Sequence, residues 1–283
     1  MGQRHFPETK EELEELVEDL NINLGDIETC LITDMNGLFS GTERTDFSGI
    51  ESWDTSNVTD MACMFYGTEH FNEDIGTWDT SKVKNMNRMF KGANNFNQPL
   101  DKWDTSSVNT MWEMFANATH FNHNINSWNV SKVEDMSSMF MGANNFNQPL
   151  DKWDTSSVKF MSAMFANATH FNQNINEWNV SKVVNMCEMF EGAINFNQPL
   201  NSWNVSKVVE MNSMFKGANN FNQPLDKWDM SSVEWMVEMF FCAKKFNQNL
   251  DSWNINDPIY DNEMFLGSPL QNNPPKWYKP KSD

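Results

Sequence analysis

The sequence predicts an α/β repeat solenoid, a rod made by stacking one short unit many times. The first observation is a tryptophan that returns every 25 residues, from Trp53 to Trp253, without an insertion. The second is that a Met-Phe pair, such as Met114-Phe115, and a further Phe followed by Asn keep the same step. Self-similarity at such a period is typical of solenoids, in which neighbouring units bury one another's apolar residues.

The composition supplies the core that this architecture needs. The 283 residues include 22 Phe, 12 Trp and 21 Met. Burying one large apolar side chain contributes about 1.5–3 kcal/mol. Each unit carries such residues in fixed columns, and they offset its ordering entropy only when both neighbours are present. We therefore interpret the Met and aromatic columns as core packing and not as a cofactor site.

The chain opens with a predicted amphipathic helix over residues 8–20. Leu13, Leu16, Val17 and Leu20 share one face, and the acidic residues lie on the other. We expect this helix to cover the open first coil. Residues 1–26 are accordingly assigned to an N-terminal cap and lead-in.

Each 25-residue unit is expected to hold a short helix. In the unit that begins at Trp103, Val108, Met111, Met114 and Phe115 have the spacing of one helical face. A serine two residues before Val108 can cap the first turn.

The rest of each unit is expected to be extended. The segment from Phe121 to Trp128 shows no helical face, and proline breaks the corresponding position of other units, as at Pro99. We expect an extended turn that leads into a very short parallel strand around each Trp. One short strand and one short helix per coil make a leucine-rich-repeat-like solenoid, with coils about 4.8 Å apart.

The repeats are expected to form a single domain of about ten coils over residues 27–265. A degenerate unit precedes Trp53, and the last unit decays after Met264-Phe265 into a Pro-rich end. Residues 266–283 are assigned to a C-terminal cap or tail, because terminal units must close the core.

The asparagine after the second Phe is predicted to form a ladder of buried amides that bond the backbone between coils. This ladder comprises Asn72, Asn97, Asn122, Asn147, Asn172, Asn197, Asn222 and Asn247.

The repeat unit resembles a known family. Its pattern, Met-Phe-x-Gly-Ala-x-x-Phe-Asn-Gln-Pro-Leu-x-x-Trp-Asp-Thr-Ser-x-Val-x-x-Met, is similar to the repeat of BspA-family leucine-rich-repeat surface proteins and of a mycoplasma surface domain of unknown function. The stretches from Thr9 to Leu13 and from Pro275 to Tyr278 resemble the usual start and end of that family. The resemblance implies a leucine-rich-repeat-like fold, adhesion to host or partner proteins, a cell-surface or secreted location and no catalytic residues.

The net charge and the hydropathy of the chain limit which kinds of partner it can have. The formal net charge is −19, which makes nucleic acid and anionic membranes poor partners. No apolar run approaches the roughly 20 residues that span a bilayer. The start of the chain lacks a signal-peptide stretch, so a cytoplasmic location stays open. We expect a monomer whose four cysteines are free, because their spacing is unpaired.

No catalytic residue, metal site or cofactor is predicted. Chemistry needs a constellation that interrupts a repeat, and little here does so. His70, His120 and His170 share one column with Asn145, which indicates surface. Stacked Asp and Asn near the turns keep calcium open as an alternative, although the Gly-rich calcium repeat is absent.

The predicted contact residues are large apolar side chains in otherwise polar columns. They are Tyr66, Trp112, Met141, Phe160, Trp235 and Phe241. The alternatives are that they pack against neighbouring exposed side chains, or that binding uses the other side of the coil near Asp101-Lys102 and Asp151-Lys152.

We therefore expect a non-enzymatic protein-binding or adhesion module. The alternative is an intracellular interaction protein or structural spacer. A signal peptide or lipobox encoded upstream of Met1 would support display at the cell surface, and a pull-down against host matrix proteins would most directly identify the ligand.

Overall fold

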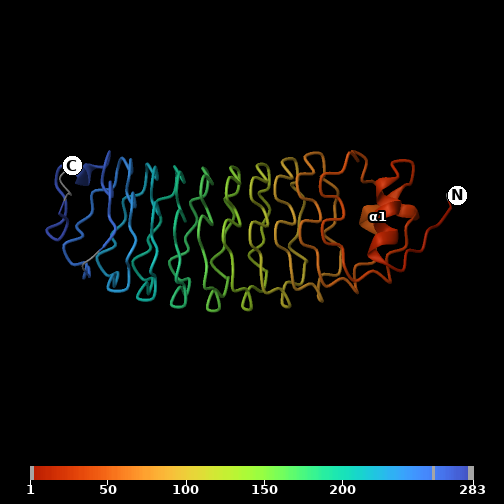
Figure 1. The fold of residues 1–283 in the computed structure, drawn as a ribbon, viewed down its shortest axis with the longest axis horizontal. Coiled ribbons are helices and arrows are strands. Elements are labelled where there is room, and N and C mark those ends of the chain that lie inside the picture. Colours follow the sequence, from red (N-terminus) through yellow and green to blue (C-terminus); the bar gives the residue numbers. More distant parts are fainter. Residues whose placement is uncertain (1–2, 257–258, 280–283) are drawn as a thin grey trace.

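The computed structural model describes residues 3–256 and 259–279. The chain forms a long rod of stacked coils, with its two ends at opposite ends of the rod (Figure 1). The helices in these ranges are α1 (Lys10–Glu18) and three 3₁₀ turns, η1 (Leu24–Asp26), η2 (Ile50–Ser52) and η3 (Pro269–Gln271). None of them has the length and apolar character required to cross a membrane.

Helix α1 covers the first coil. The Thr9 hydroxyl caps it by accepting the Glu12 N–H at 3.2 Å. Leu13 and Val17 are fully buried against the core, and Leu16 is partly buried there. The expectation for Leu20 was wrong: the helix ends at Glu18, so Leu20 lies beyond the apolar face and is exposed.

Arg44 ties this cap to the solenoid. Its buried guanidinium donates to the carbonyl oxygens of Val17 at 3.0 Å, Asp19 at 2.7 Å and Ile22 at 3.2 Å. The last carbonyls of a helix have no partner within the helix, so Arg44 satisfies groups that would otherwise be unpaired. The repeat pattern gave no signal for this residue.

The core consists of three stacks of aromatic rings that run along the rod. Ring centroids in adjacent coils lie 5.5–5.9 Å apart in the column of Phe115. The spacing is 5.2–6.2 Å in the column of Phe121. In the Trp column it is 6.2–6.5 Å.

The predicted helix in each coil is wrong. Val108, Met111, Met114 and Phe115 are buried, but the segment consists of successive turns. The N–H of Met114 bonds the Met111 carbonyl three residues back. Turns of three residues produce the same apolar spacing as a helical face, so periodicity could not separate them.

A backbone ladder replaces the helix. Alternate N–H groups donate to the carbonyl oxygens of the next coil: Glu113 to Ser137 at 2.9 Å and Phe115 to Met139 at 2.9 Å. Glu113 is left-handed, with φ of 54°, as is the same position of the other coils from Cys63 to Glu263. This alternation aims every second N–H along the rod.

The parallel pairing therefore lies away from the Trp, and the expected strand around Trp is wrong. Each coil contributes one parallel bridge, such as Thr110 with Asp135.

We call the segment equivalent to residues 109–117 in every coil the ladder face. We call the segment equivalent to residues 120–129 the amide face.

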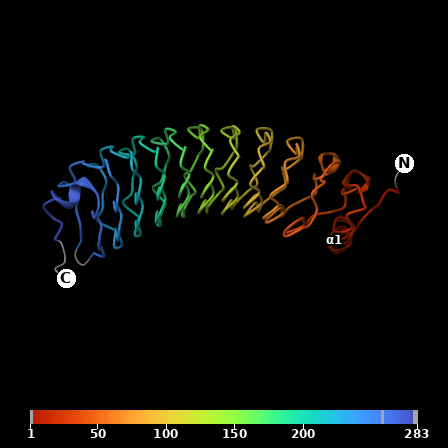
Figure 2. The same cartoon turned by 90° about the horizontal axis from the view of Figure 1, so that it is seen from above.

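The ladder explains why the rod curves (Figure 2). Hydrogen-bonded backbones stand about 4.8 Å apart, whereas equivalent Trp rings stand 6.2–6.5 Å apart. Coils that are closer on one side than on the other form an arc. The ladder face is therefore the concave side, and the expectation of one uniform spacing between coils is wrong, because the Trp rings stand farther apart than hydrogen-bonded backbones do.

The C-terminal cap continues the tryptophan stack. Trp277 lies 5.9 Å from Trp253, and its Nε1 donates to the Leu250 carbonyl at 2.8 Å. Each repeat Trp makes the same bond to the preceding coil, as Trp253 does to Leu225 at 2.8 Å. Trp277 thus adds one further ring to the tryptophan stack.

Candidate interaction surface

The amide face joins coils through side chains. The Asn72 amide oxygen accepts the Asn97 N–H at 2.8 Å, and the series continues in every coil to Asn222, which accepts the Asn247 N–H at 2.9 Å. The expectation of buried amides was wrong, because these side chains are exposed or half-buried. The Phe before each Asn points into the core, which turns the Asn outward.

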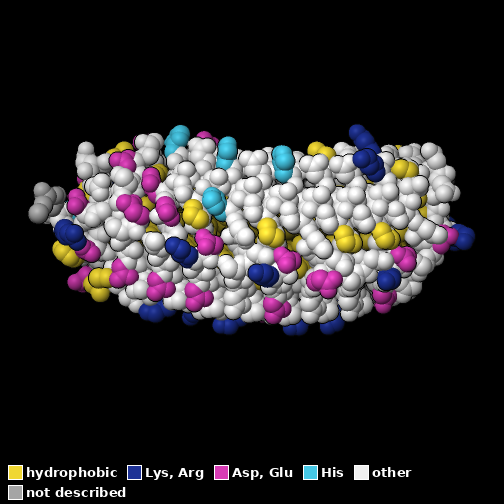
Figure 3. All heavy atoms as spheres, turned by 180° about the vertical axis from the view of Figure 1, so that it is seen from behind, with side chains coloured by type: hydrophobic (Ala, Val, Ile, Leu, Met, Phe, Trp, Pro, Cys, Tyr) yellow, Lys and Arg dark blue, Asp and Glu magenta, His cyan; other side chains and the backbone are white. Residues whose placement is uncertain are grey.

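The neighbouring side chains of this face are also engaged. Gln173 donates to the Asn147 carbonyl at 2.9 Å, and a ring nitrogen of His170 lies 2.7 Å from the Asn144 carbonyl oxygen. Figure 3 shows histidine side chains along the upper edge of a broad, largely uncharged band and also within it. A hollow of about 670 Å³ lies here, lined by Asn147, His170, Asn172, Asn195, Asn197, Asn220, Asn222 and Lys245.

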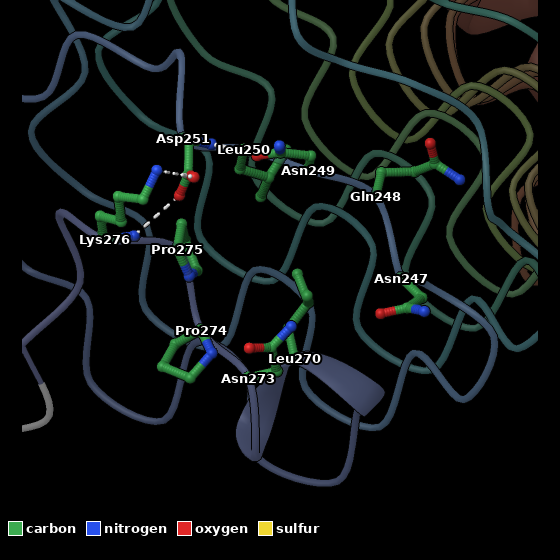
Figure 4. Close-up of a pocket in the computed structure, with 10 residues that line it drawn as sticks. All are labelled: Asn247, Gln248, Asn249, Leu250, Asp251, Leu270, Asn273, Pro274, Pro275 and Lys276. Atoms are coloured by element: carbon green, nitrogen blue, oxygen red, sulfur yellow. Dashed lines mark hydrogen bonds and ion pairs between the residues drawn. The ribbon is translucent and has the colours of Figure 1, made fainter.

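A second hollow, of about 360 Å³, lies beside the C-terminal cap (Figure 4). The Asp251 carboxylate accepts the Lys276 N–H at 2.9 Å and contacts its ammonium at 2.8 Å. These bonds lower the pKa of Asp251 and raise the pKa of Lys276. The polar groups of this hollow hold the cap in place.

The six predicted contact residues all lie on the ladder face. Tyr66, Phe160 and Trp235 are 40%, 42% and 37% exposed. Trp112, Met141 and Phe241 are half-buried. The structure does not bring the six into one patch: Trp235 and Phe241 share a coil, and the other four fall in different coils along the rod.

Tyr66 and Trp112 belong to a cluster in the N-terminal half of the ladder face. The Arg88 guanidinium lies 3.9 Å from the Trp112 ring centre, and the Lys91 ammonium lies 5.9 Å from that of Tyr66. Both cations contact the Glu113 carboxylate, at 2.5 and 2.7 Å. Burial alone would raise the pKa of Glu113, but the bonds from Lys91 and Arg88 outweigh it and lower that pKa.

Trp235 and Phe241 belong to a second cluster near the C-terminal end. The Trp235 ring stacks on Tyr260 in the next coil, with centroids 4.0 Å apart and planes within 7°. Phe241 lies under the Lys216 ammonium at 5.4 Å, and Lys216 bonds Glu238 at 2.6 Å. Sequence reasoning missed Tyr260, although it stands 25 residues after Trp235, because the unit around it decays.

The groups that could do chemistry are dispersed. Within the described residues, no three or more His, Cys, Asp or Glu side chains are placed together to hold a metal ion. Cys30, Cys63, Cys187 and Cys242 are free thiols. Burial raises the pKa of Cys187 to about 11.

These features define a curved repeat solenoid with a variable concave surface. The chain belongs to the family described as Mycoplasma protein of unknown function, DUF285, which matches three times in tandem, over residues 10–111, 99–193 and 172–277. The resemblance to the mycoplasma-type repeat is thereby confirmed.

Other comparisons add little. No curated protein matches the sequence. A solved structure titled "Crystal structure of TLR13-ssRNA13 complex" is similar, with 7% identity and a TM-score of 0.21, over 92% of this chain and 52% of that one. The chain thus spans about half the length of that protein, and a TM-score of 0.21 supports no statement on fold or ligand.

Proposed function

We propose that this protein is a non-enzymatic protein-binding module of the adhesive kind, and that it binds through its concave ladder face. The observation that carries the proposal is that large aromatic side chains stand exposed where the fold does not require them. The column of Phe160 and Trp235 also holds Asp60, Asn85 and Thr110. Exposed apolar residues in such a column mark contact surface.

The concave shape supports the same proposal. Solenoids commonly bind along their concave surface, because each coil offers a few side chains at a regular spacing. The resemblance to BspA-family surface proteins favours adhesion and display at the cell surface or secretion. Of the alternatives, a structural spacer needs no such aromatic residues, whereas an intracellular interaction protein would use the same surface.

The test replaces aromatic residues by residues that occupy the same position in other coils of this chain. The triple variant Trp112→Ser, Phe160→Asn and Trp235→Asn places on the ladder face residues found in the same columns at Ser137, Asn185 and Asn85. Both proteins are measured against a panel of purified extracellular-matrix proteins by biolayer interferometry. We expect at least tenfold weaker binding by the variant to any partner of the natural chain, as for loss of several interface aromatics.

A matched control lies on the other side of the coil. Lys102→Ser, Lys152→Ser and Lys227→Ser introduce the serine found at Ser127, Ser202 and Ser252. This variant is expected to bind within about twofold of the natural chain, since rim charges contribute little. If it loses binding while the aromatic variant does not, the contact surface is the amide side and the proposal is wrong. If neither natural chain nor variants bind any of the panel, the spacer alternative is favoured.

A further inference from the structure

The aromatic residues of the ladder face differ in what covers them. A cationic side chain from an adjacent coil lies over three of these rings. The cation stands 5.9 Å from the ring centre of Tyr66, 3.9 Å from that of Trp112 and 5.4 Å from that of Phe241. Each of those cations also contacts a glutamate. The chain thus builds the same unit three times: an aromatic ring, a cation over it and a carboxylate that holds the cation.

The Trp235–Tyr260 pair has the ring and the carboxylates of this unit. Glu210 pairs with Trp235 through the parallel bridge of the preceding coil, and Glu234 adjoins Trp235 in the sequence. Among residues 3–256 and 259–279, no lysine or arginine lies over either ring of the pair. No ion pair of Glu210 or Glu234 occurs in these ranges.

The backbone holds these groups rigidly. The Trp235 N–H bonds the Val209 carbonyl at 3.2 Å, and the Tyr260 N–H bonds the Glu234 carbonyl at 2.9 Å. The Asn185 amide fixes one Glu210 oxygen, Oε2, at 2.7 Å. A ligand would therefore meet a preformed ring surface, which lowers the entropic cost of binding. Glu210 stands one bridge position from Trp235, with its Oε2 turned toward Asn185 in the coil before it.

We propose that the Trp235–Tyr260 pair binds an arginine side chain of a basic partner protein. The guanidinium stacks on the exposed ring, as Arg88 does on Trp112 within this chain, and donates to the Glu210 and Glu234 carboxylates. Arginine suits the site because its planar cation both stacks on aromatic faces and bonds carboxylates in a fork. This inference rests on the proposed function, since it names the chemistry of the partner at one end of the same face.

Phe160 shows why the site is specific. It occupies the same column as Trp235 and is equally exposed. Its bridge partner Asp135 stands where Glu210 stands for Trp235, but the residue before Phe160 is the cation Lys159, where Trp235 is preceded by Glu234. Lys159 pairs with Glu134 at 2.7 Å, and the next coil offers Asn185 in place of the Tyr260 ring. Because a cation beside the ring opposes a second cation and no ring stacks on Phe160, this residue provides a matched control.

The test titrates the protein, labelled with 5-fluorotryptophan, with two short peptides and follows the ¹⁹F spectrum. The peptides are acetyl-Gly-Arg-Gly-amide and its citrulline analogue, which has the same shape without the charge. The Trp235 signal is assigned by its loss in Trp235→Leu. We expect the arginine peptide to shift this signal saturably and the citrulline peptide to bind at least about fivefold more weakly, from the strength of a partly desolvated cation–π contact.

Two variants sharpen the outcome. Glu210→Gln with Glu234→Gln should weaken the arginine peptide about threefold to tenfold, within the range for charge-assisted hydrogen bonds at a partly exposed site. Phe160→Trp places a fluorinated ring in the control position, and its signal should show no saturable shift. Equal shifts with both peptides, or equal shifts of the control ring, would overturn the inference. A Trp235 shift that depends on protein concentration without peptide would also overturn it, because a second copy would then occupy the pair.

Failure here is distinguishable from failure of the proposed function. If the triple aromatic variant loses a matrix partner but arginine selectivity is absent, the ladder face still binds protein and the partner's contact is not basic. If arginine selectivity is present but the triple variant keeps its partner, the aromatic pair binds guanidinium and the adhesive surface lies elsewhere.

Discussion

The ladder face and the amide face join the same coils in two different ways. On the ladder face, backbone N–H groups bond backbone carbonyls, as between Glu113 and Ser137 at 2.9 Å. On the amide face, side chains make the bonds: Trp128 Nε1 donates to the Leu100 carbonyl at 2.8 Å, and the Asn97 amide oxygen accepts the Asn122 N–H at 3.0 Å. A backbone bond is available to any residue, whereas a side-chain bond requires one residue type.

This difference accounts for the pattern of variation within the chain. The Trp column keeps one residue in nine coils, while the bridge column holds Asp, Asn, Thr, Phe, Glu, Trp and Tyr. Function can therefore be placed on the ladder face without loss of the fold. The predictions below test how completely the two faces are separated in this way.

The largest difference in stability is expected between Trp153 and Phe160. Trp153 is buried, stacks on Trp178 at 6.2 Å and donates to the Ile125 carbonyl at 3.1 Å. Trp153→Ala should lower the free energy of unfolding by about 3–5 kcal/mol, because a large cavity replaces the ring. Phe160→Ala should change it by less than about 0.5 kcal/mol. Denaturant titration of both variants measures this, and comparable losses would show that the ladder face is as constrained as the core.

A half-buried thiol measures how far the ladder face is shielded from solvent. Burial, with the nearby Glu210 charge, raises the pKa of Cys187 to about 11. At pH 8 the thiolate is scarce, so alkylation should be roughly a hundredfold slower than for a peptide thiol of ordinary pKa near 8.5. The rate should rise about tenfold per pH unit until the pH approaches 11. Iodoacetamide kinetics on a chain with serine at the other three cysteines tests this; a peptide-like rate at pH 8 would contradict it.

A smaller effect is expected from the amide ladder. Asn147 accepts the Asn172 N–H at 2.9 Å and the Gln173 amide at 3.0 Å. Asn147→Ala should destabilise the chain by about 1 kcal/mol, the net contribution of an ordinary hydrogen bond, because the site is only half-buried. Asn145→Ala, in an exposed variable column, should cost less than about 0.5 kcal/mol. Equal denaturation midpoints for the two variants would mean that the ladder does not stabilise the stack.

The smallest effect concerns the turn that follows each Trp. The Ser156 hydroxyl and N–H donate to Asp154 and lower the pKa of its carboxyl. A lowered folded-state pKa gives stability that is present above the unfolded value near 4 and is lost as the pH falls through the folded value. Asp154→Asn, which copies Asn129, should therefore lose slightly less stability than the natural chain between pH 5 and pH 2. Ser156→Ala should act in the same direction, and a steeper acid loss in either variant would show the sign to be wrong.

The repeat, the buried columns and the capping helix could be predicted because each leaves a periodic signal. The coil's backbone could not. Glu113 and Ala163 adopt the left-handed conformation without being Gly or Asn, so their identities give no sign of it. The ladder is a property of neighbouring coils, and a single unit shows only an apolar spacing that helices share.

The candidate site was predictable in part for a related reason. Phe160 and Trp235 stand out as apolar residues in a polar column, and sequence reasoning found them. Their grouping depended on which columns share the concave side, which only the pairing reveals. Tyr260 lies in the same column but within a decayed unit, and the ion pair of Lys159 with Glu134, beside Phe160, is a contact between coils.

The most direct test of the ladder replaces each of two adjacent serines by glycine and compares the free energies of unfolding. Ser138 is left-handed, with φ of 54°, while Ser137 has an ordinary negative φ. Ser138→Gly should raise the free energy of unfolding by about 1 kcal/mol, because glycine removes the cost of that conformation. Ser137→Gly should lower it by about 0.5–1 kcal/mol. Opposite signs in paired denaturant titrations are the predicted result; destabilisation by both substitutions, as in a helix, would contradict the ladder.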